Sequence, residues 1–378
     1  MKKMLRNIID RWIRYPLIRF LSQHLLNELK QEQDQIREML SHEFSEQKKF
    51  NEYIAKEILF KTHVPMMCGN LPTVFSDMKN DPEFMKKVEE FSSCLDEESK
   101  NHLELYLRKA KILPKYYGNN GMLELQPFNL PHMCGLLSPE DLFMITNQDK
   151  ILSDISSSYR KSYDISNIPI SLHVHYYNNG LIYIPDNVLE HARGTVALDC
   201  GAWVGDTAIM LNTYGFEAIH CFEPNPSTFE ILRDNINRNN DKGHFICHNK
   251  AVGDRSDTLY MENGGNLGGG ARIAENGTIK VECVVLDDFW KEPERIGLIK
   301  FDVEGFEKAA LSGAEKIIRK NKPILLVAAY HEWAAQGQMF DLLSYIKSLD
   351  LGYRFMFRGM APDYGLVYEY DLICYVPC

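Results

Sequence analysis

The stretch VALDCGAWVGDTA, from Val196 to Ala208, decides the fold of this 378-residue chain. An apolar run typical of a buried strand ends at Asp199, and Gly201 and Gly205 then allow a tight turn into a helix. Open α/β sheets bind ligands at such a carboxyl edge, where the backbone approaches the ligand closely. The spacing is G-x-x-x-G, without the three glycines of the G-x-G-x-x-G dinucleotide loop. The turn therefore predicts a ligand site, and its acid favours a zwitterionic ligand over a pyrophosphate.

A second acid follows at the distance expected for a ribose contact. Glu223 ends the next predicted strand, IHCFEP, twenty-four positions after Asp199, which is near the ~20-residue spacing of a ribose-binding acid. Its carboxylate can accept hydrogen bonds from both ribose hydroxyls, and the alternative is a solvated acid at a strand end. A third strand runs into NKAVGD, where such folds line an adenine ring. Asp254 either accepts from the adenine amino group or forms the turn after Gly253.

Strands and helices alternate from about Asn167 to the C-terminus, which predicts an α/β fold. The predicted strands are TVALDC, AIHCFE, HFICHNKAV, LIKFD, ILLVAAY, YRFMFR and DLICYV, with helices starting near Asp206, Ser227, Phe306 and Gln338. This order predicts a doubly wound, mostly parallel seven-stranded sheet with one antiparallel strand inserted at the end. Before it, ISLHVHYY and LIYIP flank Asn178-Asn179-Gly180, a pattern that predicts a β-hairpin.

Two regions precede this predicted domain of residues 167–378. Residues 1–50 predict a basic amphipathic helix and then at most a short, broken coiled coil, which gives weak support for a homo-oligomer. The basic helix carries Trp12 and suits either peripheral membrane contact through residues 1–30 or docking on protein. Residues 51–166 predict a mainly helical accessory region, in which Asp96 is placed to cap a helix.

A second cluster of acids follows the fourth predicted strand of the sheet. Lys300-Phe301-Asp302 ends at the same edge as Asp199, so we expect Asp302 to point into the crevice. Glu304 and Glu307 lie in the first turn of the next helix, where acids are favoured by the helix dipole. Helix capping alone would explain Glu307.

His331 ends the fifth predicted strand and is expected to face the same crevice. Histidine is the side chain best suited to take a proton near neutral pH, although a hydrogen-bonded structural histidine is the alternative. A metal-assisted mechanism would draw on Asp287, Asp288 and Asp302. Because nothing in the sequence fixes their geometry, we expect no metal and a capping role for Asp287 and Asp288.

Together these stretches resemble one family of enzymes. DCGAWVGDT, FEPNP, NKAVGD, VVLDDF, IKFDVEGFEKAALSGA and AAYH follow the order and spacing of the FkbM family of S-adenosylmethionine (SAM)-dependent methyltransferases, over roughly Asn167 to Cys378. The resemblance implies a class I methyltransferase fold and, usually, methylation of a hydroxyl on a saccharide or small metabolite. The segment FRGMAPDYGLVYEYDL departs from the usual C-terminal form of the family, which leaves the acceptor open.

The resemblance also implies roles for single residues. Asp199, Gly201, Gly205 and Glu223 become SAM contacts, while Asp302, Glu304, Gly305 and Glu307 fall in the motif that faces the acceptor. Neighbouring positions complete the predicted SAM site: Ala202, Asp206, Thr207, Asn225, Ala251, Val252 and Asp254. We predict His331, Asp302 and Glu304 as the catalytic residues. The alternatives are N-methylation of another small acceptor and a non-catalytic adaptor that uses the same fold.

Composition and patterning exclude several other classes. A net charge of -10 argues against a nucleic-acid partner, because phosphate affinity comes mainly from Lys and Arg. The nine cysteines show no C-x-x-C pair, which fits reduced thiols in a cytoplasmic protein. No run approaches the ~18 apolar residues of a transmembrane helix. We therefore expect a cytoplasmic enzyme, in peripheral contact with the inner face of the membrane if the N-terminal helix binds lipid.

Overall fold

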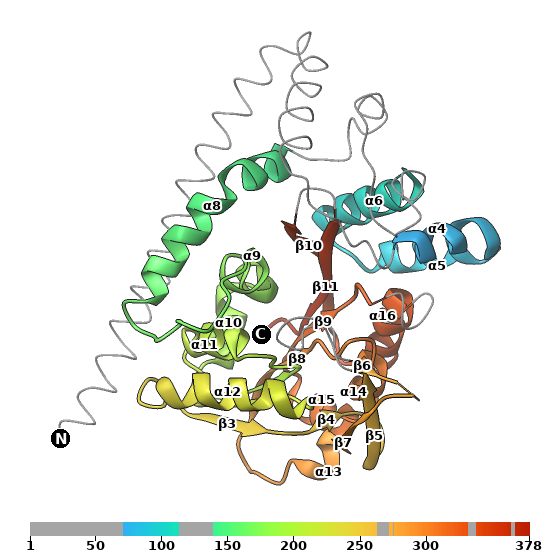
Figure 1. The fold of residues 1–378 in the computed structure, drawn as a ribbon. Helices are drawn as coiled ribbons and strands as arrows, with labels where there is room; N and C mark the ends of the chain where they lie inside the picture. The colour runs from blue at the N-terminus through green and yellow to red at the C-terminus, as the bar shows by residue number, and fades with distance from the viewer. Residues whose placement is uncertain (1–70, 113–138, 263–271, 275, 332–337, 364–366) are drawn as a thin grey trace.

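The computed structural model describes residues 71–112, 139–262, 272–274, 276–331, 338–363 and 367–378 (Figure 1). The amphipathic helix and the coiled coil predicted for residues 1–50 lie outside the described residues. The predicted membrane contact and homo-oligomer therefore stay predictions. Among the described helices, none combines the length and apolar character needed to cross a membrane.

A seven-stranded sheet forms the centre of the molecule, in the order β10-β11-β9-β8-β1-β2-β3. Its strands are β1 (Val196–Cys200), β2 (Ala218–Phe222), β3 (Phe245–His248), β8 (Ile296–Phe301), β9 (Ile324–Ala328), β10 (Arg354–Asp363) and β11 (Val367–Tyr375). β1 pairs in parallel with β2 and β8, while β11 is antiparallel to both β9 and β10. The predicted doubly wound, mostly parallel sheet with a late antiparallel strand is confirmed. The strand order reverses between β1 and β8, the place where such sheets bind ligands.

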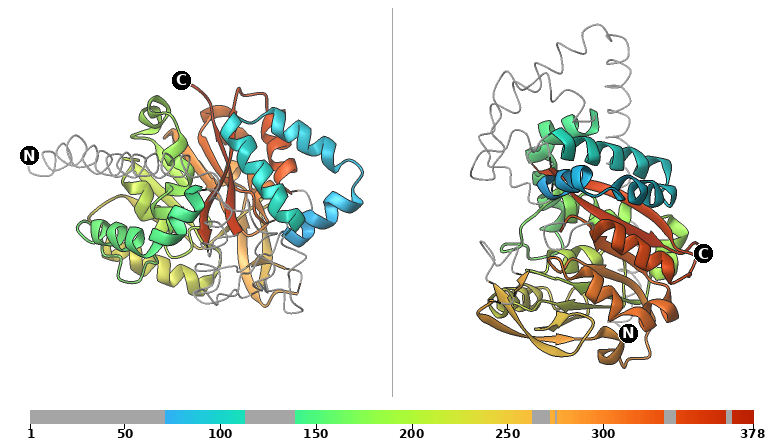
Figure 2. Two further views of the ribbon diagram at one scale, coloured as in Figure 1. Left: turned by 90° about the horizontal axis from the view of Figure 1, so that it is seen from above. Right: turned by 90° about the vertical axis from the view of Figure 1, so that its right-hand side faces the viewer.

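Helices cover both faces of this sheet, and Figure 2 shows the two layers on either side of the strands. One face packs against α8 (Pro139–Tyr159), α9 (Leu172–His175), the 3₁₀ helix η4 (Asn178–Tyr183), α10 (Asp186–Ala192), α11 (Asp206–Asn212) and α12 (Pro226–Arg238). The other face packs against α4 (Leu71–Asn80), α5 (Phe84–Ser93), α6 (Glu97–Ile112), α13 (Leu286–Phe289), α14 (Glu307–Ser312), α15 (Glu315–Asn321) and α16 (Gln338–Ser348).

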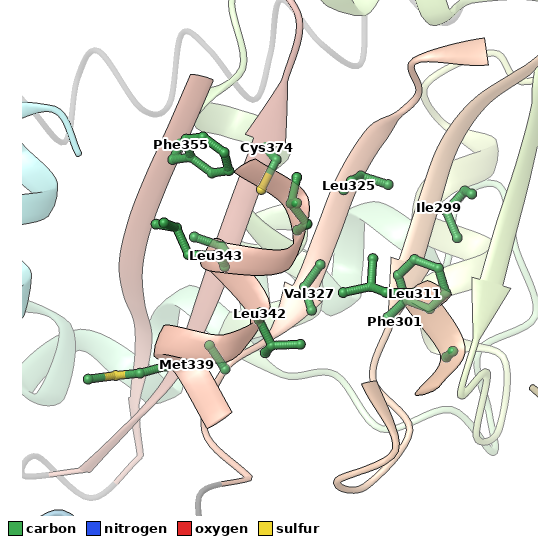
Figure 3. Packing of buried hydrophobic residues seen from close by; sticks show 14 of the residues in the cluster. Ile299, Phe301, Leu311, Leu325, Val327, Met339, Leu342, Leu343, Phe355 and Cys374 are labelled. Atoms are coloured by element: carbon green, nitrogen blue, oxygen red, sulfur yellow. The ribbon is translucent and has the colours of Figure 1, made fainter. Parts of the chain in front are cut away.

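Alternation along the strands builds one hydrophobic cluster on each face. Leu298 of β8 and Leu326 of β9 belong to the cluster with α11, whereas Ile299 and Val327, one position on, belong to the cluster with α14 and α16. Figure 3 shows the second cluster, in which strand side chains meet Leu311 of α14 and the apolar face of α16. Because both faces are buried, these strands are almost entirely apolar, with Lys300 of β8 as the exception, as parallel strands in α/β proteins usually are.

A second sheet of four strands was not predicted from the sequence. Its order is β4-β7-β5-β6, with β4 (Ala251–Val252), β5 (Asp257–Glu262), β6 (Arg272–Ile273) and β7 (Ile279–Val284). The single predicted strand HFICHNKAV is in fact two, because the chain leaves the large sheet at Asn249. The Asn249 side chain there donates to the carbonyl oxygens of Glu223 and Pro224, at 2.9 and 3.0 Å. β4 then pairs with β7 of the small sheet.

The predicted β-hairpin around Asn178-Asn179-Gly180 was wrong. The three residues do have positive φ angles (51°, 50° and 88°), as a tight hairpin turn would require. Instead of strands, the flanking segments form α9 and η4. The hydroxyl of Ser171 accepts a hydrogen bond from the N–H of Val174 at 3.2 Å and so caps α9. The left-handed turn thus joins two short helices that pack against α11.

The helices before residue 167 join the core of the sheet. The predicted cap is present, since Asp96 accepts a hydrogen bond from the N–H of Ser99 at 2.7 Å at the start of α6. Arg358 of β10 is buried and binds Asp96 and Glu98 at 2.9 and 3.0 Å, and its guanidinium lies 5.1 Å from the centre of the Tyr183 ring. One hydrophobic cluster contains residues of α4, α5 and α6 together with residues of the sheet.

We expect this shared core to make the α5 helix and the sheet unfold together. Phe91 of α5 packs edge-on against Phe340 of α16 and Phe357 of β10, with ring centres 5.5 and 5.4 Å apart. Truncation of a buried phenylalanine costs about 3–5 kcal/mol. Urea unfolding of Phe91→Ala should therefore show a loss of that size in a single transition.

Met85→Ala serves as the matched control, because Met85 lies on the same helix and is 57% exposed. It should leave the free energy of unfolding nearly unchanged. An early, separate helical transition in Phe91→Ala, with the main transition unmoved, would contradict a shared core.

Candidate active site

A cavity of about 320 Å³ opens at the carboxyl edge of the large sheet, at the point where the strand order reverses. Its walls come from the ends of β1, β2 and β8, from β4 and β6 of the small sheet, and from α9, η4, α11 and β11. The lining residues are His173, Val174, Asn179, Gly201, Trp203, Asp206, Thr207, Phe222, Glu223, Pro224, Lys250, Ala251, Val252, Met261, Ile273, Lys300, Asp302, Val303, Glu304, Phe306 and Glu369.

Most of the residues predicted from the sequence lie at this cavity. Those that line it are Gly201, Asp206, Thr207, Glu223, Ala251, Val252, Asp302 and Glu304. Those outside the lining are Asp199, Ala202, Gly205, Asn225, Asp254 and His331. Asp254 is exposed at the turn after β4, and Asn225 caps α12 by accepting from the N–H of Ser227 at 3.0 Å. The structure therefore gives a capping contact, rather than a cavity contact, to Asn225.

The turn after β1 requires glycine because the backbone of Asp302 passes close to it. Gly201 has a φ of 89°, and a Cβ added there would lie 1.8 Å from the backbone oxygen of Asp302. Only glycine fits this approach, because any side chain would force β1 and β8 apart. Gly205, with a φ of 92°, is the residue that precedes α11. The close approach brings both predicted motifs to one edge.

A buried lysine, to which the sequence motifs assign no role, connects these two motifs. The ammonium group of Lys300 lies 3.2 Å from Asp302 and 3.6 Å from Asp199, and it donates to the carbonyl oxygen of Gly201 at 3.2 Å. Burial raises the pKa of Asp199 to about 7. Burial acts in the same direction on Asp302, but the nearby Lys300 outweighs it and lowers the Asp302 pKa to about 2. Asp302 is thus a firmly ionised carboxylate in the cavity wall.

Glu223 lies at the end of β2 and faces the cavity. Its two oxygens accept hydrogen bonds from the backbone N–H groups of Trp203 at 3.1 Å and Asn225 at 2.8 Å, which fix the side chain in place. Burial raises the pKa of Glu223 to about 8. A carboxylate held in this way has lone pairs left to accept hydrogen bonds from a diol.

His331 lies behind the cavity wall and contacts three acids. Its Nδ1 is 2.8 Å from Glu307, and its Nε2 is 3.5 Å from Glu304 and 3.9 Å from Asp302. Although burial opposes it, Glu307 raises the pKa of His331 to about 9. The imidazole is therefore protonated near neutral pH, which does not suit the general-base role that the sequence suggested.

Glu307 holds the turn that carries Glu304. Its Oε1 accepts from the N–H groups of Val303 at 3.0 Å and Gly305 at 3.2 Å, and Gln338 donates to its other oxygen. Asp302, Glu307 and His331 approach one another closely enough to surround a metal ion. The backbone contacts of Glu307, however, already explain its burial. Asp287 lies elsewhere and caps α15, accepting from the N–H groups of Lys316 and Ile317 at 2.8 and 2.9 Å.

A second histidine lines the cavity and was missed because its segment was predicted to be a strand. His173 of α9 contacts Glu369 through Nδ1 at 2.5 Å and Asp371 through Nε2 at 2.7 Å, and both acids belong to β11. Burial opposes protonation, but the two carboxylates raise the pKa of His173 well above its usual value. Glu369 lines the cavity, so this cluster extends the acidic wall beyond Glu304.

The segment that contains most of this site is similar to a known protein family. Residues 199–355 match the family model described as the methyltransferase FkbM domain. No curated protein sequence matches the chain. Among solved structures, the methyltransferase FkbM from Methylobacillus flagellatus KT is similar at 18% sequence identity and a TM-score of 0.42. That match covers 74% of this chain and 61% of the other, so this chain spans about three fifths of its length.

Two further solved structures are similar over about half of this chain or more. The O-methyltransferase from Bacillus cereus, solved with SAH, has 13% identity and a TM-score of 0.33, over 60% of this chain and 100% of that one. An rRNA methylase from Streptococcus thermophilus has 12% identity and a TM-score of 0.33, over 51% of this chain and 93% of that one. The FkbM resemblance noted in the sequence is confirmed by the family match, which contains both the glycine turn and the Asp302 motif.

The contact of His331 with Glu307 predicts a pH-dependent stability. The folded-state pKa of about 9 lies above the ordinary value of 6.5, so the contribution is complete below pH 6.5 and is lost as the pH rises through 9. It amounts to at most about 3 kcal/mol, since one pKa unit corresponds to about 1.4 kcal/mol. The difference in unfolding free energy between wild type and His331→Gln should shrink by about that amount from pH 6 to pH 10.

Denaturant unfolding across this pH range measures the difference directly. His191→Gln, at an exposed histidine on α10, is the matched control for the loss of an imidazole and should leave the unfolding free energy at pH 6 close to that of wild type. A constant difference between wild type and His331→Gln would contradict a protonated His331.

Proposed function

From the premise that residues 199–355 form a methyltransferase FkbM domain, we propose that this chain transfers the methyl group of SAM to a hydroxyl of a saccharide or small metabolite. The observation that carries the proposal is the composition of the cavity. A diol-binding acid, Glu223, lies on one side of the glycine turn, and ionisable acids of the family's second motif, Asp302 and Glu304, lie on the other. One cavity therefore offers both a cofactor side and an acceptor side.

The residues on the cofactor side fit SAM. Glu223, fixed by two backbone N–H groups, suits the two ribose hydroxyls. Ala251 and Val252 of β4, with Met261 and Ile273, give an apolar surface beside it that suits a planar adenine. Gly201 allows close approach of the backbone between these two regions and Asp302. When bound, SAM supplies a methyl group already activated by the sulfonium charge.

The acceptor side has to orient a hydroxyl and remove its proton. Orientation can contribute about 7–11 kcal/mol in favourable cases, and a general base about 100- to 10,000-fold in rate. We propose Glu304 as the proton acceptor. It lines the cavity, and burial raises its pKa above the usual value even though His331 acts in the opposite direction. The O–H proton of the acceptor would pass to the Glu304 carboxylate as the new O–C bond forms and the S–CH3 bond breaks, with the electron pair of that bond left on sulfur in the neutral thioether SAH.

Asp302 and His331, which the sequence suggested as catalytic residues, have other roles in this proposal. Asp302, with a pKa near 2 beside Lys300, stays ionised and accepts a hydrogen bond from the acceptor without taking its proton. Tyr330 donates to Asp302 at 3.1 Å and fixes its direction. His331 lies outside the cavity and positions Glu304 from behind.

The cofactor half of the proposal is tested by binding. In calorimetry above pH 8, where Glu223 is ionised, Glu223→Ala should weaken SAH by about 10-fold or more, since hydrogen bonds to a charged group are lost. Glu217→Ala, an exposed acid just before β2, should bind as wild type. Wild-type affinity should also fall as the pH drops below about 8, because Glu223 becomes protonated, and Glu223→Ala should lose this dependence.

Failure of the wild-type protein to bind SAH would contradict the cofactor assignment and favour the adaptor alternative. Binding unaffected by Glu223→Ala would instead remove Glu223 from the site.

The chemical half is tested by methyl transfer from labelled SAM to a panel of saccharides and small alcohols. With the best acceptor, Glu304→Gln should lower turnover by about 100-fold or more and leave SAH affinity close to that of wild type. Glu89→Gln, an exposed acid of α5, should retain full turnover. Transfer to amines but to no hydroxyl would contradict O-methylation, and unchanged single-turnover transfer would remove Glu304 from catalysis.

A further inference from the structure

Asn179 is a buried polar residue of the cavity wall to which the sequence assigned no role. It is 1% exposed, lies in η4 with a left-handed φ of 50°, and lines the cavity. Its Nδ2 donates to the hydroxyl of Thr207 at 3.1 Å, which fixes the amide plane. Its Oδ1 has no hydrogen-bond donor among the described residues. Buried acceptors are nearly always satisfied, so this oxygen is suited to a donor on a ligand.

A carboxylate, that of Asp206, lines the same cavity. Asp206 begins α11, lines the cavity and is 7% exposed. One of its oxygens accepts from the N–H of Thr207 at 2.8 Å, so Asp206 and Asn179 are held by the same residue. Burial raises the pKa of Asp206 to about 6, which a bound positive charge would reverse. Two acceptors with one negative charge match a primary ammonium group, which has three N–H donors.

The order of the strands indicates which part of a bound cofactor would lie beside Asn179 and Asp206. Glu223 follows β2, and the apolar surface of Ala251 and Val252 lies on the β3 side of it. With the ribose at Glu223 and the adenine towards β4, the 5′ substituent of the ribose would point to the β1 side. Gly201, Asp206 and Asn179 line the cavity there.

We propose that Asn179 and Asp206 form the subsite for the ammonium group of the methionine end of SAM. The inference rests on the proposed function, because it takes the cofactor side of the cavity as given. Asn179 is a binding residue that precedes the matched family segment of residues 199–355. It acts on the amino-acid tail of the cofactor and not on its nucleoside.

Two ligands that differ only in this tail give a direct test. SAH carries the amino-acid tail, and 5′-methylthioadenosine carries the same nucleoside and sulfur without it. Calorimetry on the full chain should show that wild type binds SAH more tightly. Asn179→Gly, which keeps the left-handed backbone, should weaken SAH by about 10- to 150-fold, the range for a hydrogen bond to a charged group. Its affinity for 5′-methylthioadenosine should stay that of wild type.

Asn178→Gly is the matched control. Asn178 has nearly the same φ, 51°, but its side chain donates to Tyr214 at 2.8 Å and does not line the cavity. It should leave both affinities unchanged. Asn179→Asp keeps an acceptor oxygen towards the tail and should retain most of the SAH affinity, which a donor role of the amide would not allow. Thermal melting establishes that each variant is folded.

The possible outcomes distinguish a failure of the proposed ammonium subsite from a failure of the proposed methyltransferase function. An equal loss for both ligands in Asn179→Gly, an unchanged SAH affinity, or equal losses in Asn179→Gly and Asn179→Asp would overturn the subsite. Wild-type protein that binds neither ligand would contradict the proposed function itself.

Discussion

The ammonium group of Lys300 is the contact on which the site depends. Lys300 is 5% exposed near the C-terminal end of β8 and stands in register beside Asp199 of β1. A buried ammonium group is costly unless opposite charges and acceptors surround it. Asp199, Asp302 and the carbonyl oxygen of Gly201 supply these partners, so the ends of β1 and β8 must stay together. The glycine turn of one motif and the acid of the other are thereby fixed to a single edge.

The C-terminal hairpin of β10 and β11 completes the cavity from outside the matched family segment. Arg358 of β10 binds the helices that precede the domain, through Asp96 and Glu98. Glu369 and Asp371 of β11 bind His173 of α9. Arg358, Glu369 and Asp371 lie in FRGMAPDYGLVYEYDL, the segment that departs from the usual form of the family. Most of the cavity lining thus lies within the matched family segment, while Glu369 on this hairpin and His173, Val174 and Asn179 before the segment complete the wall.

What could be predicted from the sequence follows from local signals. Apolar strands that end in an acid or a glycine turn predicted the sheet, Glu223 and Asp302, because strand ends in such folds meet at one edge. The Lys300 contact needed the register of β1 against β8, which no local signal contains, although a lysine in a buried strand is itself a sign of a charged partner. Asn178-Asn179-Gly180 predicted a hairpin, and although the three residues do have positive φ angles, the hairpin was wrong. The type of turn does not determine whether strands or helices flank it, because that depends on how the flanking segments pack against α11. The sequence therefore did not indicate that His173 and Asn179 line the cavity.

Three acids of the cavity wall share one arrangement, in which a buried cationic side chain contacts the carboxylate. Lys300 contacts Asp302, His331 contacts Glu304, and His173 contacts Glu369. A cation in this position favours the ionised form of the acid that it contacts, while burial favours the neutral form. The balance differs from one pair to the next. Lys300 prevails at Asp302, whose pKa falls to about 2, whereas burial prevails at Glu304, whose pKa is raised. In the proposed reaction, the two neighbouring carboxylates of this wall would therefore have different tasks, Asp302 to bind the acceptor and Glu304 to take the proton of the reacting hydroxyl, and this difference is set by the groups that contact them.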